Sequence, residues 1–117
     1  MHPLSRIAAV LLAWLPAFAA QADSPAQQYG LALEAQTAGD YPRMLALLQS
    51  AAGAGHVPAQ QTLGLALLGG PALYGQAIAS DPCAARHWLA RAARAQGAAP
   101  PAVFARPRAQ LPAGCQP

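Results

Sequence analysis

The residues whose types and spacing could support catalysis or metal binding are few. Cys83 and His87 share one face of a predicted helix, because side chains at i and i+4 are neighbours, and they could supply two metal ligands. His56 is the evident third, whereas zinc sites use three or four protein ligands. Ser80, Asp81 and His87 have the residue types of a hydrolytic triad, but helix capping already explains Asp81. We therefore expect no catalytic residues, no metal site, no cofactor and no enzymatic activity.

Other functional motifs are also missing from the sequence. It contains no Lys, which excludes a Ser-x-x-Lys nucleophile, and it has no Cys-x-x-Cys or His-Glu-x-x-His pattern. The formal net charge of +3 includes Arg6, and the other arginines are dispersed along the chain. Nucleic-acid binding requires a dense basic surface, so we expect no nucleic-acid partner.

Residues 1–22 have the pattern of a secretory signal peptide. Arg6 is followed by an apolar segment over residues 7–20, and small residues in Ala20-Gln21-Ala22 precede Asp23. Ala17-Phe18-Ala19 is a second possible cleavage site. The apolar segment makes about 21 Å of helix, shorter than a bilayer core of about 30 Å, so no stable membrane insertion is expected after cleavage. The absence of Lys and Asn indicates a GC-rich bacterium, and we expect a periplasmic or secreted protein.

The chain has two cysteines, Cys83 and Cys115, and both follow the predicted leader. In an oxidising compartment, a disulfide between them is the leading interpretation. Such a bond would contribute roughly 3–4 kcal/mol by closing a loop in the unfolded chain. Two free thiols, or pairing of one cysteine with another chain, are the alternatives.

The composition favours helices. The 117 residues include 32 Ala, and only 9% are charged, which is too apolar for a disordered chain. Two Ile, three Val and two Thr are too few for a β-sandwich. Capping residues, prolines and glycines predict helices over about 25–37, 41–54, 58–68 and 82–96, with Ser24, Asp40 and Asp81 as N-caps.

Two segments recur along the chain, which indicates a repeat. Pro25-Ala26-Gln27-Gln28 returns as Pro58-Ala59-Gln60-Gln61, and Leu47-x-x-x-Ala51-Ala52 returns as Trp88-x-x-x-Ala92-Ala93. Each unit is predicted to be two antiparallel helices that approach closely through small residues. The residues expected to pack the repeat are Leu47, Ala51, Ala52, Leu63, Gly64, Leu67, Ala85, Trp88, Ala92 and Ala93.

These segments resemble Sel-1-like repeats. Residues 39–56, from Gly-Asp-Tyr to Gly-His, resemble the second helix of one repeat, and residues 58–70, with Leu63-Gly64, resemble the first helix of the next. Residues 81–97, with Trp88 and Ala92-Ala93, resemble its second helix. The resemblance covers residues 25–98 and implies an α-solenoid, related to tetratricopeptide repeats, whose concave face binds proteins or peptides.

The predicted fold is accordingly all-α: a short α-solenoid of antiparallel helix pairs with a Pro-rich C-terminal cap. We divide the chain into a signal peptide (1–22), a Sel-1-like helical repeat domain (23–98) and a Pro-rich capping tail (99–117), in which Phe104 and Leu111 are candidate anchors. The predicted function is an exported, non-catalytic repeat protein that binds a protein or peptide in the bacterial cell envelope. One alternative is a structural subunit that completes its solenoid by oligomerising. A small hydrolase or metal-dependent enzyme is less favoured.

Four residues are candidates for contact with the partner. Gln28, Tyr29 and Gln61 fall on the first helices of the two units, and Tyr74 lies in the apolar loop over residues 71–79. Leu73 and Ile78 of this loop are expected to fold back over the helices as a lid on the core, although Tyr74 could still anchor a partner.

Overall fold

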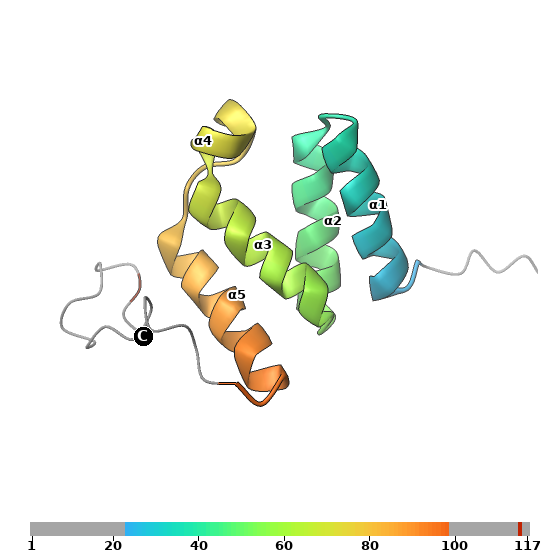
Figure 1. Ribbon diagram of the computed structural model, residues 1–117. Helices are drawn as coiled ribbons and strands as arrows, with labels where there is room; N and C mark the ends of the chain where they lie inside the picture. Colours follow the sequence, from blue (N-terminus) through green and yellow to red (C-terminus); the bar gives the residue numbers. More distant parts are fainter. Residues whose placement is uncertain (1–22, 99–114, 116–117) are drawn as a thin grey trace, which may run out of the picture.

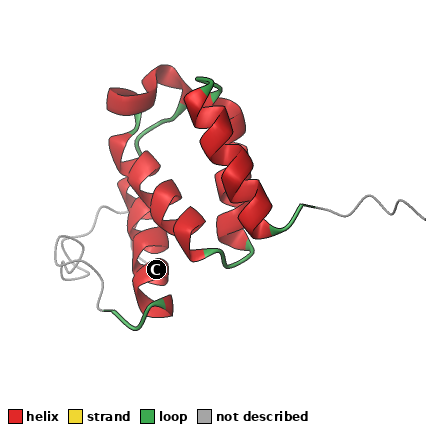
Figure 2. Cartoon of the chain, turned by 45° about the vertical axis from the view of Figure 1, so that its right-hand side comes forward, coloured by secondary structure: helices red, strands yellow, loops and turns green. Residues whose placement is uncertain are grey.

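The computed structural model describes residues 23–98 and Cys115. The described part consists of helices and turns, which confirms the all-α prediction (Figures 1 and 2). The predicted signal peptide and, apart from Cys115, the capping tail lie outside the described residues. In chain order the elements are α1 (Pro25–Thr37), α2 (Tyr41–Gly53), α3 (Val57–Gly69), α4 (Pro71–Tyr74), a 3-10 turn η1 (Gly75–Ala77) and α5 (Pro82–Ala95).

The helices begin where the capping residues predict. The backbone N–H of Gln27 donates to Ser24 Oγ (3.2 Å), while the Ser24 N–H donates to Gln27 Oε1 (2.8 Å), which completes a capping box. Asp40 Oδ1 accepts from the backbone N–H at the third residue of α2 (3.3 Å), and Asp81 Oδ1 accepts in the same way in α5 (3.0 Å). The start of α3 has no side-chain cap, and this helix begins one residue earlier than predicted, at Val57.

Neighbouring helices pack antiparallel in chain order. Figure 1 shows α1 beside α2, α2 beside α3 and α3 beside α5, and these are the principal helix contacts. The turns after α1, α2 and α5 close alike: Asp40, His56 and Ala98 each donate a backbone N–H to a carbonyl five residues back (2.8–3.1 Å). The predicted packing order of four main helices is therefore present, with α4 added between α3 and α5.

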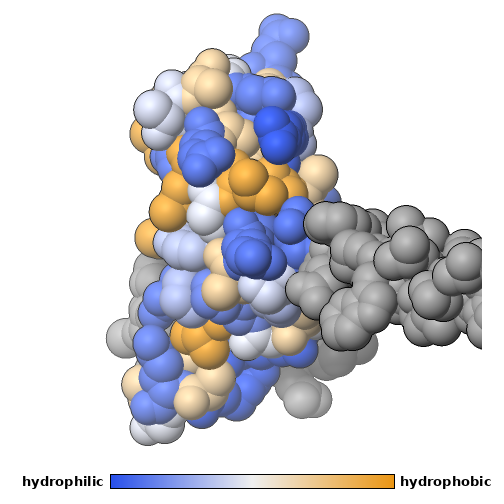
Figure 3. All heavy atoms as spheres, turned by 90° about the vertical axis from the view of Figure 1, so that its right-hand side faces the viewer, coloured by the Kyte–Doolittle hydropathy of each residue, from blue (hydrophilic) through white to orange (hydrophobic). Residues whose placement is uncertain are grey.

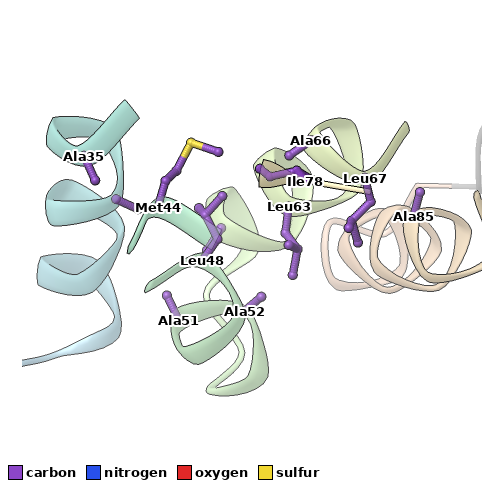
Figure 4. Packing of buried hydrophobic residues seen from close by; sticks show 12 residues of the cluster. Ala35, Met44, Leu48, Ala51, Ala52, Leu63, Ala66, Leu67, Ile78 and Ala85 are labelled. Atoms are coloured by element: carbon purple, nitrogen blue, oxygen red, sulfur yellow. The ribbon is translucent and has the colours of Figure 1, made fainter. Parts of the chain in front are cut away.

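The core lies along the α1–α2–α3–α5 contacts, and Figure 4 shows side chains from all of these helices converging on it. Its members are mostly alanines, with larger side chains from α2, α3 and the loop before α5. The cluster comprises Ala32, Ala35, Met44, Leu48, Ala51, Ala52, Ala59, Leu63, Ala66, Leu67, Ile78 and Ala85. Among the other packing positions considered above, Gly64, Ala92 and Ala93 are buried, and Leu47 and Trp88 are half-buried against the core.

The structure aligns the two helix pairs differently from the Pro-Ala-Gln-Gln match. Helices α1 and α3 have equal length, so Val57 takes the place of Pro25. The buried residues agree with this alignment, because Gly64 then matches Ala32 and Leu67 matches Ala35. As a result Gln28 corresponds to the buried Gln60, and the exposed surface of α3 differs from the one that the sequence match implies.

The loop after α3 folds back only in part. Ile78 is fully buried in the core, as predicted, but Leu73 is 64% exposed, so the prediction that it covers the core is wrong. The short helix α4 accounts for the difference, because it turns Leu73 onto Gly69 at the end of α3, away from the core. Beyond η1, the Asp81 N–H donates to the Leu67 carbonyl (2.9 Å) and returns the chain to α3.

Gly64 sets the approach of α3 to α5. A Cβ at this position would lie 2.8 Å from Leu89 Cδ2 and 3.3 Å from the Ala85 carbonyl oxygen. We predict that Gly64→Ala lowers the free energy of unfolding by about 1–3 kcal/mol, because the two helices must separate or Leu89 must leave its rotamer. Urea unfolding followed by circular dichroism measures the change.

Gly30→Ala is the matched control for this experiment. Gly30 is exposed within α1 and a Cβ there meets no atom within 4 Å, so the substitution should stabilise the protein by about 0.5–1 kcal/mol. Equal effects of the two alanines would contradict the close packing of α3 on α5.

Position 70 requires glycine for two reasons, the backbone conformation and the lack of room for a side chain. Its φ is +48°, and a Cβ would lie 2.7 Å from the backbone nitrogen of Ser80. Gly75 has a similar φ of +58°, but a Cβ there meets nothing within 4 Å. We predict that Gly75→Ala costs about 1–3 kcal/mol through backbone strain alone, and that Gly70→Ala costs clearly more. Thermal unfolding of both variants tests which substitution costs more stability. Equal losses would mean that the α4 segment moves aside and does not hold Gly70 against Ser80.

Candidate partner-binding surface

The predicted contact residue Tyr29 joins α1 to α3. Its hydroxyl group lies 3.2 Å from Thr62 Oγ1, and its ring packs against His56 with ring centroids 5.2 Å apart. The side chain is half-buried, so one part of the ring holds the two helices together while the remainder reaches solvent. Tyr29 therefore lies at the junction of α1 and α3, in contact with both helices.

The two predicted glutamines form hydrogen bonds within the chain. Gln28 Oε1 accepts from Ser50 Oγ on α2 (3.0 Å), and Gln61 Nε2 donates to Gln96 Oε1 at the end of α5 (3.2 Å). Both glutamines are half-buried, so each ties one helix to the next in its pair. A partner that used these amides would compete with the existing hydrogen bonds.

Tyr74, the fourth predicted contact residue, packs against α2. Its ring packs edge-on against Tyr41 at the start of α2, with ring centroids 5.0 Å apart, and it is half-buried. The four predicted contact residues thus belong to separate contacts: Tyr29 at the α1–α3 junction, each glutamine within one helix pair, and Tyr74 on α2.

Gln60 is a polar side chain that sequence reasoning did not single out. It is 2% exposed, and its Nε2 donates to the Ala52 carbonyl oxygen at the end of α2 (3.2 Å). Its Oε1 has no hydrogen-bond partner in the described part of the chain. The only sequence signal for its burial was its position next to Ala59, on the side of α3 that packs against the core. The Pro-Ala-Gln-Gln match hid this signal because it paired Gln28 with Gln61 and not with Gln60.

Exposed leucines form the most prominent apolar surface of the described residues. Leu65 is 59% exposed and Leu68 is 40% exposed on α3, Leu73 is 64% exposed on α4, and Leu33 is 39% exposed on α1. Sequence reasoning missed them because leucine at helical spacing usually indicates core. The available signal was that residues 63–69 of α3 are all apolar or glycine, whereas a surface helix normally has a polar face.

The leucines of α3 and α4 are continuous. Leu65 and Leu68 share one face of α3, and the side chain of Leu73 lies against Gly69, the residue after Leu68. We call Leu65, Leu68 and Leu73 the leucine surface. Leu33 lies apart on α1, where it lines a shallow hollow of about 420 Å³ with Glu34, Thr37 and Ala38. Figure 3 views the molecule from the side of α1 and α2, where small apolar groups interrupt a mostly hydrophilic face.

The charged side chains of the described residues all lie outside α3, α4 and η1. Residues 57–80, which include α3, α4 and η1, contain no charged side chain. Arg86, Arg91 and Arg94 are on α5, where Arg91 lies 5.5 Å above the centre of the Trp88 ring in a cation–π contact. Three of the four arginines in residues 23–98 therefore lie on α5, and α3, α4 and η1 carry no charged side chain of their own.

The candidate catalytic groups are occupied by structural roles. Cys83 is bonded to Cys115, which removes its thiolate as a metal ligand, and Asp81 caps α5. The His56 ring packs at a tilt against Tyr29, and His87 is exposed beside Trp88. Over residues 23–98 and Cys115, no three His, Cys, Asp or Glu side chains come together in a way that could hold a metal ion. Within the same residues, no helix has the length and apolarity needed to cross a membrane.

The Cys83–Cys115 disulfide joins the start of α5 to the C-terminal segment, with Cα atoms 5.0 Å apart. Cys83 shares its side of α5 with His87 and Arg94, opposite the buried Ala85 and Ala92. The bond therefore fixes Cys115 against the outer side of the last helix. A disulfide in a chain of this size is consistent with an oxidising compartment outside the cytoplasm.

Comparisons with protein-family models, curated proteins and solved structures give no match for this chain. The structure itself establishes a small all-α domain of antiparallel packed helices with one disulfide. Its helix order, its α1–α3 junction and its leucine surface are the features from which a function must be inferred.

Loss of the disulfide should weaken the fold measurably. We predict that Cys115→Ser lowers the free energy of unfolding by roughly 3–4 kcal/mol, since the unfolded chain loses a loop closure between positions 83 and 115. Urea unfolding of the oxidised protein, the reduced protein and the variant gives the comparison. Reductant should destabilise the wild type and leave Cys115→Ser unchanged. Mass spectrometry that finds two alkylated thiols before any reduction would contradict the bond.

Proposed function

We propose that this protein is an exported, non-catalytic Sel-1-like repeat protein that binds a protein or peptide through the solvent-facing sides of α1, α3 and α4. The periplasm, or the medium outside the cell, is the compartment we assign to it. In this proposal the pairs α1–α2 and α3–α5 are two repeats of a short α-solenoid. Partner binding, not chemistry, is then the role of the domain.

The location of the exposed leucines carries this proposal. Each large apolar side chain found exposed in residues 23–98 belongs to α1, α3 or α4, and α2 and α5 contribute none. Exposed apolar surface of this kind is typical of interaction sites when it is gathered on one set of elements. In a solenoid of helix pairs, the first helices line one common surface, and α1 and α3 are the first helices here.

Further support comes from the order of the elements. The resemblance over residues 25–98 implies helix pairs that pack in sequence, and the principal contacts follow that order. The Tyr29–Thr62 contact links the two first helices directly, as stacked repeats require. The occupied roles of Cys83, Asp81 and His56 give no support to a hydrolase or a metal-dependent enzyme.

Replacing Leu65 tests the proposed binding surface. The tagged wild type, Leu65→Ser and Ala46→Ser are each used to capture partners from the periplasmic extract of the native cell. Ala46 is exposed on α2, so Ala46→Ser places the same hydroxyl group on a helix outside the proposed surface. We expect Leu65→Ser to lose about tenfold or more of the captured partner, because a central apolar contact is removed.

Ala46→Ser should retain the partner, and circular dichroism should show equal helix content in all three proteins. Equal capture by Leu65→Ser and wild type would place the binding site elsewhere. If the wild type captures nothing above an untagged control, partner binding as the function of this domain is wrong.

A further inference from the structure

Residues 71–77, which comprise α4 and η1, are attached to the domain differently from the long helices. No residue of this segment is buried, whereas Gly70 before it and Ile78 after it are buried. Figure 1 shows the segment beyond the end of α3, level with the start of α2. We call residues 71–77 the flap, since they form an exposed stretch between two buried positions.

The two ends of the flap are held together at a closed neck. A Cβ on Gly70 would lie 2.7 Å from the backbone nitrogen of Ser80, and the Asp81 N–H donates to the Leu67 carbonyl (2.9 Å). A loop whose ends lie this close together is a compact surface unit. Movement of the flap therefore leaves the end of α3 and the start of α5 in place, because both are fixed at the neck.

The backbone hydrogen bonds of the flap close within it or at its neck. The N–H groups of Leu73 and Tyr74 donate to the Gly70 carbonyl (3.2 and 3.0 Å), and that of Gly75 donates to the Pro71 carbonyl. In the part of the chain that the structure describes, no hydrogen bond joins the flap to α1, α2 or α5. Side-chain contacts alone hold the flap against these helices.

Two side chains make these contacts. Leu73 lies against Gly69 at the end of α3, but it remains 64% exposed, so it buries little apolar area. Tyr74 packs edge-on against Tyr41 at the start of α2, with ring centroids 5.0 Å apart, and it is half-buried against the core. An aromatic pair of this geometry contributes more than its buried area. The Tyr41–Tyr74 pair is therefore the main contact that keeps the flap closed.

We propose that the flap opens as one unit while the rest of the domain stays folded, with the Tyr41–Tyr74 pair as its latch. The chain turns about Gly70 and Gly75, which flank α4 and have positive φ values of +48° and +58°. Glycine changes its backbone conformation more readily than any other residue. Opening loses few contacts, so it costs less free energy than global unfolding.

The flap also determines how far the leucine surface extends. Leu73 belongs to the flap, whereas Leu65 and Leu68 belong to α3. In the closed form Leu73 lies against Gly69 and adjoins the leucines of α3, and opening separates it from them. The inference concerns a motion of the free protein, so it goes beyond the proposed function and does not depend on it.

Hydrogen exchange of the full, disulfide-bonded protein, measured by NMR, tests the proposed motion. The amides of Leu73, Tyr74 and Gly75 are hydrogen-bonded in the closed form, and we expect their protection factors to agree within about threefold. They should be at least about tenfold lower than those of α3. Low concentrations of urea should leave them unchanged, because a local opening exposes little surface. Flap amides that follow the protection and the urea dependence of α3 would overturn the proposal.

Replacement of Tyr41 tests the latch without a change in the flap sequence. We expect Tyr41→Ala to lower the protection of the flap amides about threefold to tenfold, because the aromatic contact is lost. Tyr41→Phe keeps the ring and should match the wild type. Tyr29→Ala is the matched control, because Tyr29 is also half-buried against one aromatic ring, at the α1–α3 junction. It should lower the protection of α3 and leave that of the flap unchanged.

The outcomes separate the unit from its latch. Equal flap protection in Tyr41→Ala and the wild type would show that the Tyr41–Tyr74 pair is not the latch. Equal loss of flap protection in Tyr41→Ala and Tyr29→Ala would show that the flap opens only with the whole domain. If Tyr41→Ala does not fold, the urea dependence of the wild type still decides whether the flap opens on its own.

Discussion

The close approach of helix backbones is the constraint on which this structure depends. Seven of the twelve residues in the core cluster are alanines, so each side chain buries little apolar area. Stability must then come from many short-range contacts between neighbouring helices, and these contacts weaken quickly with distance. Gly64 is the clearest case, because even a methyl group there would collide with Leu89. The domain is therefore stabilised by closely spaced helices and not by large core side chains.

Helix α3 bears most of this constraint. It packs on α2 on one side and α5 on the other, and α4 lies at its end. Two buried sides require apolar and small residues over most of its circumference, which Leu63, Leu67 and Gly64 supply. The remaining side has no packing partner among the described helices, yet it carries Leu65 and Leu68. Internal packing does not account for these two leucines, and the proposed binding of a partner would account for them.

Helix positions were predictable from local chemistry, whereas side-chain roles were not. Ser24, Asp40 and Asp81 fixed the helix starts because each satisfies backbone N–H groups within its own first turn. In contrast, the position of α4 depends on the close packing of Gly70 against the backbone of Ser80. These two residues are ten positions apart, and no local sequence pattern predicts that they are in contact. The all-α fold and the order of the helices therefore followed from the sequence, while the exposure of Leu73 did not.

The exposed residues of the candidate site differ from the predicted contact residues for a related reason. Gln28 and Gln61 were chosen as polar side chains on the first helices of the units, but a half-buried amide favours a partner within the chain, and each found one. The leucines were passed over because apolar residues at helical spacing usually lie in the core. Distinguishing core from contact surface required knowledge of which sides of α3 its neighbours occupy.

The helices pack in the order α1, α2, α3 and α5, and the outer sides of α1 and α5 form the two ends of this row. The residues at these ends differ from those on α3, which affects where another molecule could bind. The solvent side of α1 carries Gln27, Gly30 and Glu34 beside the 39% exposed Leu33, while the outer side of α5 carries His87, Arg94 and the disulfide. These ends are mostly polar, whereas a solenoid that grows by stacking further copies would need apolar ends. The leucine surface instead lies along the side of α3. The partner of the proposed function would then bind along the side of α3 and not at the ends of the row, which favours a bound segment over polymerisation of the chain.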